Sequence, residues 1–408
     1  MLKLQMLPAG CGDCLWLEYG TPPATHVVII DGGVGKTVKA LNDRIEMACR
    51  ERGQTTLDVE LLVVTHIDND HIMGIIELLK AKPSFLKVKE VWFNGLPQLK
   101  SLPAPASLET QFEQRERRSR PADLLGDSDG DEDLEESESL DNFIALPSPG
   151  DLLGRQQSDD LTQLLTSSGL SWNVSWDGKA VMIPDTGALP TKTLAGKLTL
   201  TLLGPPLARL YKLCTVWPDV LGGDDDQSAL PAALPDDLLG PRDTWPPVWK
   251  EGEQRDSSSA NGSSIMLLAE YKEHKLLLAG DGYAPDIAAA LERLSRERNI
   301  QSSFPIHAFK LPHHASAHNL SRAVLDRIDC CRYLISTDGS GRPKHPDHQA
   351  LLRILRYSRK RPQLFFNYLG DTTRPWRDMK AEVVSAGFQD YDTSFPKTPA
   401  EGLILELE

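Results

Sequence analysis

Four side chains of metal-ligand type stand within six residues early in the chain. The stretch VVTHIDNDHIMGI, residues 63 to 75, contains His66, Asp68, Asp70 and His71 directly after an apolar run. A divalent ion that activates water at neutral pH needs three or four nitrogen or oxygen ligands and one open position. In a tight loop after a strand, His66 and Asp68 can serve one ion while Asp70 and His71 serve a second ion about 3.5 to 4 Å away. The spacing therefore predicts a centre for two divalent ions.

Two later segments place further ligand types at the ends of apolar runs. Asp281 follows KLLLAG, and the doublet His313-His314 follows AFKLP. Because α/β sheets gather their ligand sites at the carboxyl ends of strands, we expect these side chains to converge on the first cluster. The Asp281 carboxylate could then bridge both ions. A single turn aspartate or strand-end histidine is commonly structural, so the repetition of the pattern carries the prediction.

Hydrophobic periodicity predicts the elements that position these residues. Short runs rich in β-branched residues indicate strands at 1–7, 14–20, 25–33, 59–66, 87–95, 179–185, 196–206, 363–370 and 402–408, and a hairpin with its turn at 272–275. Helical spacing indicates helices at 36–52, at 71–81 and after Gly282. The segments 307–328 and 331–355 each read as a strand, a histidine-bearing loop and a helix. Gly74 in the second helix would let the backbone approach the site closely.

Two segments interrupt this pattern. Residues 97–160 are polar, and the part from 123 to 141 carries ten acidic and no basic residues. Such a segment buries too little apolar surface to offset its ordering entropy, so it is predicted to be a mobile acidic insertion in a single domain spanning 1–408. Residues 216–258, rich in Pro and Asp, are predicted to be a second insertion loop. The acidic run shares features with a calcium loop, but its spacing to a final glutamate is wrong and flanking amphipathic helices are missing.

Composition limits the possible partners. The net charge of −14 over 408 residues argues against a general affinity for nucleic acid or anionic membranes, although basic residues around KLPHH and GRPKHP could meet phosphate locally. No run approaches the roughly 18 to 20 apolar residues that cross a bilayer. Six scattered cysteines and the lack of a signal-peptide pattern indicate a cytoplasmic protein. The C-x-x-C of Cys11 and Cys14 lacks a second ligand pair and is expected to be structural.

The stretch THIDNDHIMGI resembles the H-x-H-x-D-H signature of the metallo-β-lactamase fold, in the variant H-x-D-x-D-H. This variant is similar to the metallo-β-lactamase domain of the DNA-uptake channel protein of competent bacteria and its soluble relatives. The likeness continues in the same order through GCGDCLWLEYG, VVIIDGG, NGSSIMLLAEYKEHKLLLAGD, KLPHHAS and GRPKHPD. It implies an α+β fold, the αββα sandwich with insertions, and hydrolysis by a metal-bound hydroxide.

The resemblance also implies roles for individual residues. The ligands of two Zn²⁺ or Mn²⁺ ions would be His66, Asp68, Asp70, His71, Asp281 and one of the doublet, with His313 preferred over His314. Asp31 would steady the cluster from behind, and Asp70 would also orient the nucleophile. In the GRPKHPD loop, His345 or Lys344 would protonate a leaving group or bind phosphate, and a plain loop role is equally compatible. His318 and His348 have weaker claims.

The chain departs from the family pattern between the first cluster and Asp281. The only histidine there is His274, which the predicted hairpin turn places badly for metal binding. The first metal position is therefore expected to be one protein ligand short, with water or Asn261 completing it. The oxygen-rich ligand set makes Mn²⁺ a competitor to Zn²⁺.

The expected function is that of a phosphodiesterase or nuclease acting on DNA or a nucleotide. A lactone, thioester or lactam hydrolysed by the same water is an alternative within the fold. An alternative of another class is a non-catalytic interaction module, with a structural metal site and an acidic insertion that binds a protein partner.

Overall fold

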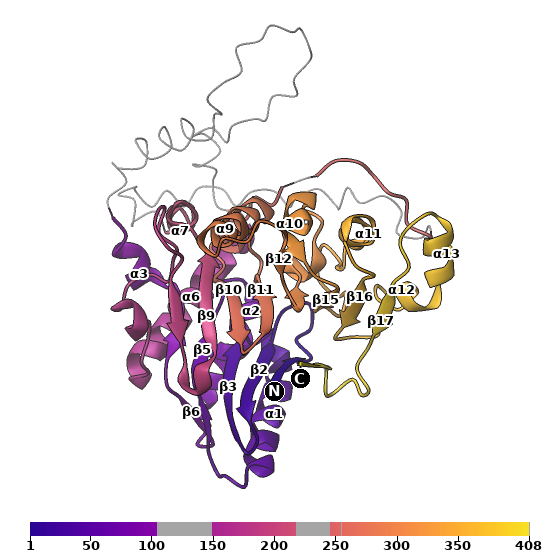
Figure 1. The fold of residues 1–408 in the computed structure, drawn as a ribbon. Helices are drawn as coiled ribbons and strands as arrows, with labels where there is room; N and C mark the ends of the chain where they lie inside the picture. Colours follow the sequence, from indigo (N-terminus) through magenta and orange to yellow (C-terminus); the bar gives the residue numbers. More distant parts are fainter. Residues whose placement is uncertain (104–148, 218–244, 254, 408) are drawn as a thin grey trace, which may run out of the picture.

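The computed structural model describes residues 1–103, 149–217, 245–253 and 255–407 as a mixed α+β structure around two sheets (Figure 1). The first sheet has the order β18 (Leu403–Leu407), β1 (Leu2–Met6), β2 (Leu15–Thr21), β3 (Ala24–Ile30), β5 (Leu61–Val63) and β7 (Val91–Trp92). The second has the order β17 (Asp392–Ser394), β16 (Gln363–Phe366), β15 (Arg332–Ile335), β13 (Ala308–Lys310), β11 (His274–Leu278), β10 (Met266–Tyr271), β9 (Thr199–Gly204) and β8 (Thr191–Thr193).

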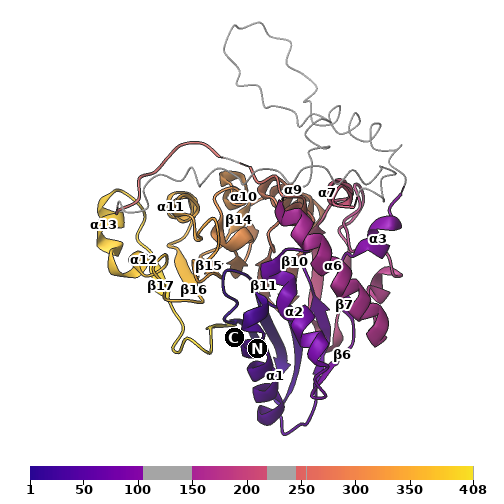
Figure 2. The same ribbon diagram turned by 180° about the vertical axis from the view of Figure 1, so that it is seen from behind.

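Helices cover the outer faces of both sheets. Figure 2 shows α1 (Val38–Glu51), α2 (Asn69–Ala81) and α6 (Pro149–Ser168) over the first sheet. Figure 1 shows α9 (Ala284–Glu297), α10 (Arg322–Arg327) and α11 (His348–Tyr357) on the side of the second sheet. Smaller elements complete the described part: α3 (Leu96–Lys100), α7 (Leu207–Cys214), α8 (Ser259–Gly262), α12 (Pro375–Asp378), α13 (Lys380–Ser385), and the strand pairs β4 (Leu57–Val59) with β6 (Leu86–Val88) and β12 (Phe304–Pro305) with β14 (Ile328–Asp329).

Residue alternation in β3 shows how the layers pack. Val28 and Ile30 lie in the core between the two sheets, together with residues of the second sheet such as Leu278. Val27 and Ile29 point the other way and belong to the core beneath the helices of the first sheet. Because successive side chains of a strand point to opposite faces, an all-apolar run of this kind is buried on both sides.

Most predicted strands and helices are confirmed, with informative exceptions. The predicted strand 179–185 is wrong, because only an isolated bridge joins Ile183 to Pro206. Asn94 explains the difference: its amide donates to the Val181 carbonyl and its oxygen accepts from the Val181 N–H, so side-chain bonds replace a strand ladder there. The runs 59–66 and 87–95 each contribute to two separate sheets, since β4 pairs with β6 while β5 pairs with β7.

The two interruptions are shorter than their predicted ranges. Residues 96–100 form α3. Helix α6 begins at Pro149 and packs against α2, and its own Leu161 and Leu165 are buried in the core. The acidic run 123–141 and residues 218–244 lie outside the described residues. Beyond the latter, the Trp245 ring lies 5.2 Å from the Trp376 ring, so this end of the second predicted insertion is attached to the second sheet's layer.

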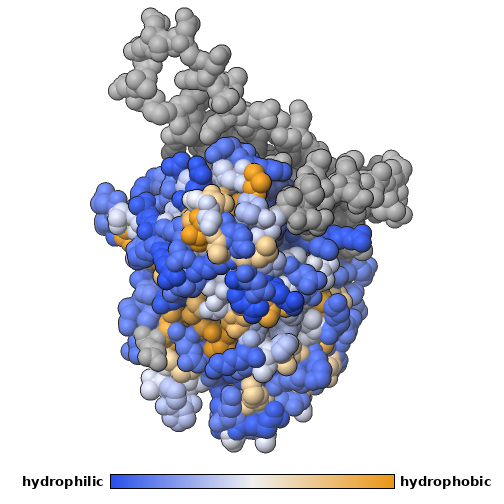
Figure 3. Space-filling view, turned by 90° about the vertical axis from the view of Figure 1, so that its right-hand side faces the viewer, coloured by the Kyte–Doolittle hydropathy of each residue, from blue (hydrophilic) through white to orange (hydrophobic). Residues whose placement is uncertain are grey.

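The described surface is mainly polar. Figure 3 shows one face as largely hydrophilic, with smaller groups of apolar side chains. Among the described residues, only four large apolar side chains are strongly exposed: Met47, Val174, Val248 and Leu369. A search of the described helices finds none with the length and apolar character that a bilayer crossing requires.

Glu18 is a buried carboxylate that ties α1 to the first sheet. Its Oε1 accepts hydrogen bonds from Thr25 Oγ1 at 2.7 Å and Arg52 Nη2 at 2.8 Å, and its Oε2 lies 3.2 Å from Arg44 Nη2 and 3.3 Å from Lys3 Nζ. Burial by itself raises the pKa of Glu18, but the Thr25 hydrogen bond and the neighbouring cations lower it to about 2. The carboxylate form is therefore the one that the fold stabilises.

We expect Glu18→Gln to lower the free energy of unfolding at pH 7 by about 2 kcal/mol, because it weakens hydrogen bonds to charged groups. Since the folded-state pKa is depressed, this stability is present above the ordinary value of 4.5 and is lost as the pH falls towards about 2. Urea unfolding at pH 7 and pH 3 measures the effect. A difference between wild type and variant that stays constant between these pH values would contradict the assignment.

Candidate metal centre

The predicted ligands meet at one edge of the two sheets. Asp31 follows β3, the segment from His66 to His71 follows β5, Asp281 follows β11, and the His313-His314 doublet follows β13. Strand β3 runs parallel to β5, and β11 runs parallel to β13. Since the carboxyl ends of parallel strands lie at the same edge, the strand order brings these loops together in pairs within each sheet, and the packing of the two sheets brings the pairs together.

Asp281 lies among four imidazole rings. Its Oδ1 is 3.3 Å from His71 Nε2, and its Oδ2 is 3.8 Å from His66 Nε2, 3.7 Å from His314 Nε2 and 3.9 Å from His313 Nε2. The side chain of Asp281 is 2% exposed. A carboxylate in this position can be shared by two neighbouring ions.

The other carboxylates divide the histidines into two sets. His314 Nε2 lies 3.3 Å from Asp70 Oδ2 and 3.3 Å from His71 Nε2, which makes these three one set. Asp68 Oδ2 lies 3.7 Å from His66 Nε2. His313 supplies the remaining Nε2 that faces Asp281, and it is the natural third member beside His66 and Asp68. Both residues of the doublet thus point into the site, where sequence reasoning admitted only one.

Each imidazole is held by its Nδ1 so that its Nε2 faces the centre. His71 Nδ1 donates to Asp31 Oδ2 at 2.8 Å, and His314 Nδ1 donates to the Ser336 carbonyl at 2.9 Å. His66 Nδ1 is 2.9 Å from Thr65 Oγ1, and His313 Nδ1 is 3.0 Å from Asn319 Oδ1. Partners of this kind fix the ring orientation and the tautomer of metal-ligating histidines.

Asp31 stands behind the cluster, as the family resemblance implies for it. Its Oδ1 accepts from the Thr65 N–H at 2.7 Å, and its Oδ2 accepts from the Thr65 hydroxyl at 2.7 Å as well as from His71. Its backbone has a φ of +59°, a left-handed conformation that turns the chain sharply after β3. Asp31 therefore couples the end of β3 to the end of β5.

Burial and the neighbouring charges shift the pKa values of the site residues in opposite directions. Burial favours the neutral forms, but Asp281 and Asp31 raise the pKa of His71 well above its usual range, and the histidines lower the pKa of Asp281 well below its own. For His313, burial lowers the pKa, but Asp281 and Asp256 together raise it to about 10. Only the neutral imidazole binds a metal, so an ion that enters this site releases protons.

These residues fit a divalent ion. Within the described residues, His66 Nε2 and Asp281 Oδ1 are buried and have no hydrogen-bond partner, although both point into the cluster. His66, His71 and Asp281 offer ligand atoms within 4.8 Å of one another, as do His71, His314 and Asp13. Imidazole and carboxylate ligands suit Zn²⁺ and Mn²⁺. The group could therefore hold a metal ion.

Asn261 lies behind His313 and not among the Nε2 atoms. Its amide nitrogen donates to Asp256 Oδ2 at 2.7 Å and is 3.4 Å from His313 Nδ1. The Oδ2 of Asp256 is 3.4 Å from His313 Nδ1. Burial by itself raises the pKa of Asp256, but His313 and the other hydrogen-bond donors to this carboxylate lower it to about 2. No sequence signal pointed to Asp256, which lies in the predicted insertion loop. His274 lies at the end of β11 remote from Asp281, with its ring 5.2 Å from that of His307.

The GRPKHPD loop brings one of its two candidates to the cluster. The His345 ring is buried 5.0 Å from the His313 ring and 6.3 Å from the His314 ring, and neither of its nitrogens has a hydrogen-bond partner among the described residues. Lys344 is exposed. His318 is also exposed, and the His348 ring packs 5.5 Å from that of Trp245. Of these four residues, His345 is the one whose ring lies beside the candidate ligands His313 and His314.

Gly74 permits a close contact between α2 and the Asp31 loop. A Cβ at Gly74 would lie 1.9 Å from the Gly32 carbonyl oxygen. In addition, the Gly74 N–H donates to Gly33 O at 2.9 Å, and the Gly32 N–H donates to His71 O at 2.8 Å. The two ligand-bearing loops are thus joined backbone to backbone.

We expect Gly74→Ala to destabilise the fold by about 1 to 3 kcal/mol, because the new methyl group forces these backbones apart. Thermal unfolding measures the loss. Gly35→Ala is the matched control, since a Cβ at Gly35 would have no neighbour closer than 3.6 Å. Equal melting temperatures for the two variants would show that the contact at Gly74 is not restrictive.

Comparisons with known proteins identify no relative. A scan of the chain against protein-family models finds no match, and a search of curated proteins finds none either. The class of protein must therefore be inferred from the residues of the site and their geometry.

Proposed function

We propose that this protein is a metal-dependent hydrolase of the metallo-β-lactamase fold that binds two divalent ions, Zn²⁺ or Mn²⁺. The order of motifs along the sequence and the helix-covered pair of sheets support the fold. The convergence of four histidine Nε2 atoms on Asp281 carries the proposal, because each ring is held from behind by its Nδ1. Two ions bound there would act as Lewis acids and bring the pKa of a coordinated water near neutrality.

The protein's own side chains divide the remaining work. Asp68 and Asp70 each have 26% of the side chain exposed and His313 has 25%, so these three residues form the solvent-facing side of the site. In this proposal, Asp70 accepts a hydrogen bond from an incoming water and orients it. Neither ring nitrogen of His345 has a hydrogen-bond partner among the described residues, and the ring lies 5.0 Å from that of His313, which supports a role for His345 as a donor to a substrate oxygen. An N–H donor next to the reacting group stabilises the charge that develops in the transition state.

The proposed substrate is a phosphodiester. Arg342 and Lys344 are exposed on either side of Pro343 in the His345 loop, where they could contact phosphate oxygens. The net charge of −14 confines such a contact to this locality, so we propose a small or locally bound phosphodiester in preference to a long nucleic-acid footprint.

A metal and substrate screen tests the proposal. The full chain is stripped with a chelator, reloaded with Mn²⁺ or Zn²⁺, and assayed against bis-p-nitrophenyl phosphate and a panel of lactones. We expect metal-dependent cleavage of the phosphodiester that Asp70→Ala reduces at least about 100-fold. Turnover of lactones alone would contradict the phosphodiester substrate and favour the alternative, a lactone hydrolase of the same fold. A protein that binds metal but cleaves neither class would favour a non-catalytic module.

A further inference from the structure

A buried ion pair lies beneath the metal centre. Lys310, at the end of β13, is completely buried, and its Nζ lies 2.7 Å from Oδ2 of Asp13, which is 1% exposed. Lys310 Nζ also donates to the Leu311 carbonyl at 2.8 Å. A buried pair of charges costs desolvation energy that its own attraction hardly recovers, so its presence in a core calls for a further reason.

Asp13 contacts three segments that carry the site. Its Oδ1 has no hydrogen-bond partner and lies 3.5 Å from His314 Nδ1. Its N–H donates to the Asp70 carbonyl at 3.2 Å, and its own carbonyl accepts from the Gly33 N–H at 2.7 Å, two residues after Asp31. The turn that carries Asp13 fits tightly against this region, since a Cβ at Gly12 would lie 1.7 Å from the Asp70 carbonyl oxygen.

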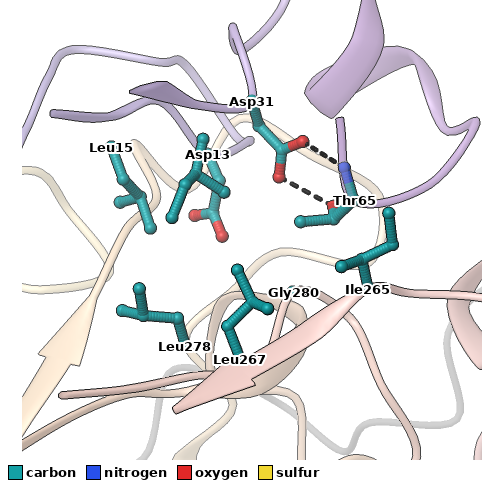
Figure 4. A pocket seen from close by; sticks show the side chains of 9 residues that line it. Asp13, Leu15, Asp31, Thr65, Ile265, Leu267, Leu278 and Gly280 are labelled. Carbon is teal, nitrogen blue, oxygen red and sulfur yellow. Dashed lines mark hydrogen bonds between the residues drawn. The ribbon is translucent and has the colours of Figure 1, made fainter. Parts of the chain in front are cut away.

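The surroundings of Asp13 preserve the effect of its charge. Figure 4 shows Asp13 and Asp31 at a small cavity between the sheets, whose other walls are mainly aliphatic and include Gly280, the neighbour of Asp281. In an apolar environment without bulk water, a carboxylate acts strongly on a nearby ring N–H. Lys310 holds one oxygen of Asp13 and leaves the other facing His314.

We propose that Asp13, held by Lys310, is a positioning residue of the metal centre. Its carboxylate, 3.5 Å from His314 Nδ1, acts on the ring together with the Ser336 carbonyl that accepts this nitrogen's N–H. Its backbone fixes the Asp70 loop, so that the positions of two of the ligands of one ion depend on a single residue. Outer partners of this kind typically change metal affinity 10- to 100-fold when they are removed. The inference rests on the proposed function, because it requires an ion between Asp70 and His314.

Titration of the metal-free full chain with Co²⁺, followed by visible absorption, tests the inference. The variants are Asp13→Asn and the double variant Asp13→Asn/Lys310→Met, in which both buried charges are absent and the folding stability is expected to return towards that of wild type. We expect wild type to bind two ions. In both variants, one of the two ions should bind about 10- to 100-fold more weakly and with altered absorption bands, while the affinity for the other ion is unchanged.

Glu18→Gln is the control, because it disturbs a buried charge network that contacts none of the proposed ligands. It should lose stability and keep both Co²⁺ affinities. Two unchanged affinities in the double variant would overturn the role of Asp13 and leave the metal centre intact. An equal weakening in Glu18→Gln would also overturn it, since the effect would then be general. A wild-type chain that binds no Co²⁺ would overturn both this inference and the proposed function.

Discussion

An Asp281→Asn variant is expected to lose tight binding of both divalent ions and to lose at least about 1,000-fold in turnover, which corresponds to about 4 kcal/mol of transition-state stabilisation. The reason is the position of this carboxylate, which faces the Nε2 atoms of His66, His71, His313 and His314 at 3.3 to 3.9 Å. A neutral amide of the same shape offers one acceptor oxygen and no charge, so neither set of ligands is complete.

Metal analysis after dialysis and steady-state kinetics measure the two effects. Asp286→Asn, in the first turn of α9, is the control, because Asp286 pairs with Arg209 and is not among the proposed ligands. Circular dichroism of Asp281→Asn separates loss of metal from loss of fold. Two ions retained by a folded Asp281→Asn protein would contradict a shared carboxylate at this position.

Single replacements of the doublet are expected to remove one ion each, and to remove different ions. His314 Nε2 faces Asp70 and His71, whereas His313 is assigned to His66 and Asp68. Replacements within one set should not add up, because the ion they share is already lost. We therefore expect His314→Ala/Asp70→Ala to retain one ion, and His314→Ala/Asp68→Ala to retain none.

Metal content of the single and double variants decides the assignment. His313→Ala/Asp68→Ala should retain one ion, as the mirror of the first pair. The exposed His318 supplies the control, since His318→Ala should keep two ions. One ion bound to His314→Ala/Asp68→Ala would mean that these residues serve the same ion, and the division of the site would be wrong.

The sequence was sufficient to predict where the site would form. Ligand-type residues directly after apolar runs mark strand ends, and parallel strands bring such ends to one edge; hence the residue pattern predicts that His66, Asp70, His71 and Asp281 lie together. The hairpin β10–β11 and the helices α1 and α2 are likewise predictable from the sequence, because each follows from local hydrophobic periodicity.

The doublet was harder to predict for a backbone reason. The family resemblance implies one histidine of the doublet as a ligand, and the alternation of side chains along an extended segment gives no reason to expect both in the site. His313, His314 and Ala315 have φ values of +44°, +51° and +69°, and this left-handed run turns both rings inward. Such conformations are uncommon outside glycine and leave no mark in the residue pattern.

The sequence pattern also does not predict the carboxylates that contact the candidate ligands on their Nδ1 side. Asp256 belongs to a segment with no periodicity, and Asp13 lies in a turn between Cys11 and Cys14 in which an aspartate is an ordinary residue. Both act through contacts with residues more than 50 positions away in sequence, His313 and His314 respectively. Contacts of that range are set by tertiary packing, which a local pattern does not encode.

The pairing of β1 with β18 has a consequence for biosynthesis. Leu2 lies opposite Leu407 and Met6 opposite Leu403, so β1 gains its outer neighbour only after residues 403–407 have left the ribosome. Until then β1 has an open edge, and open edges recruit strands from other chains. Nascent chains stalled before residue 403 should therefore be aggregation-prone and depend on chaperones, even though the sequence bearing the proposed ligands has already been translated.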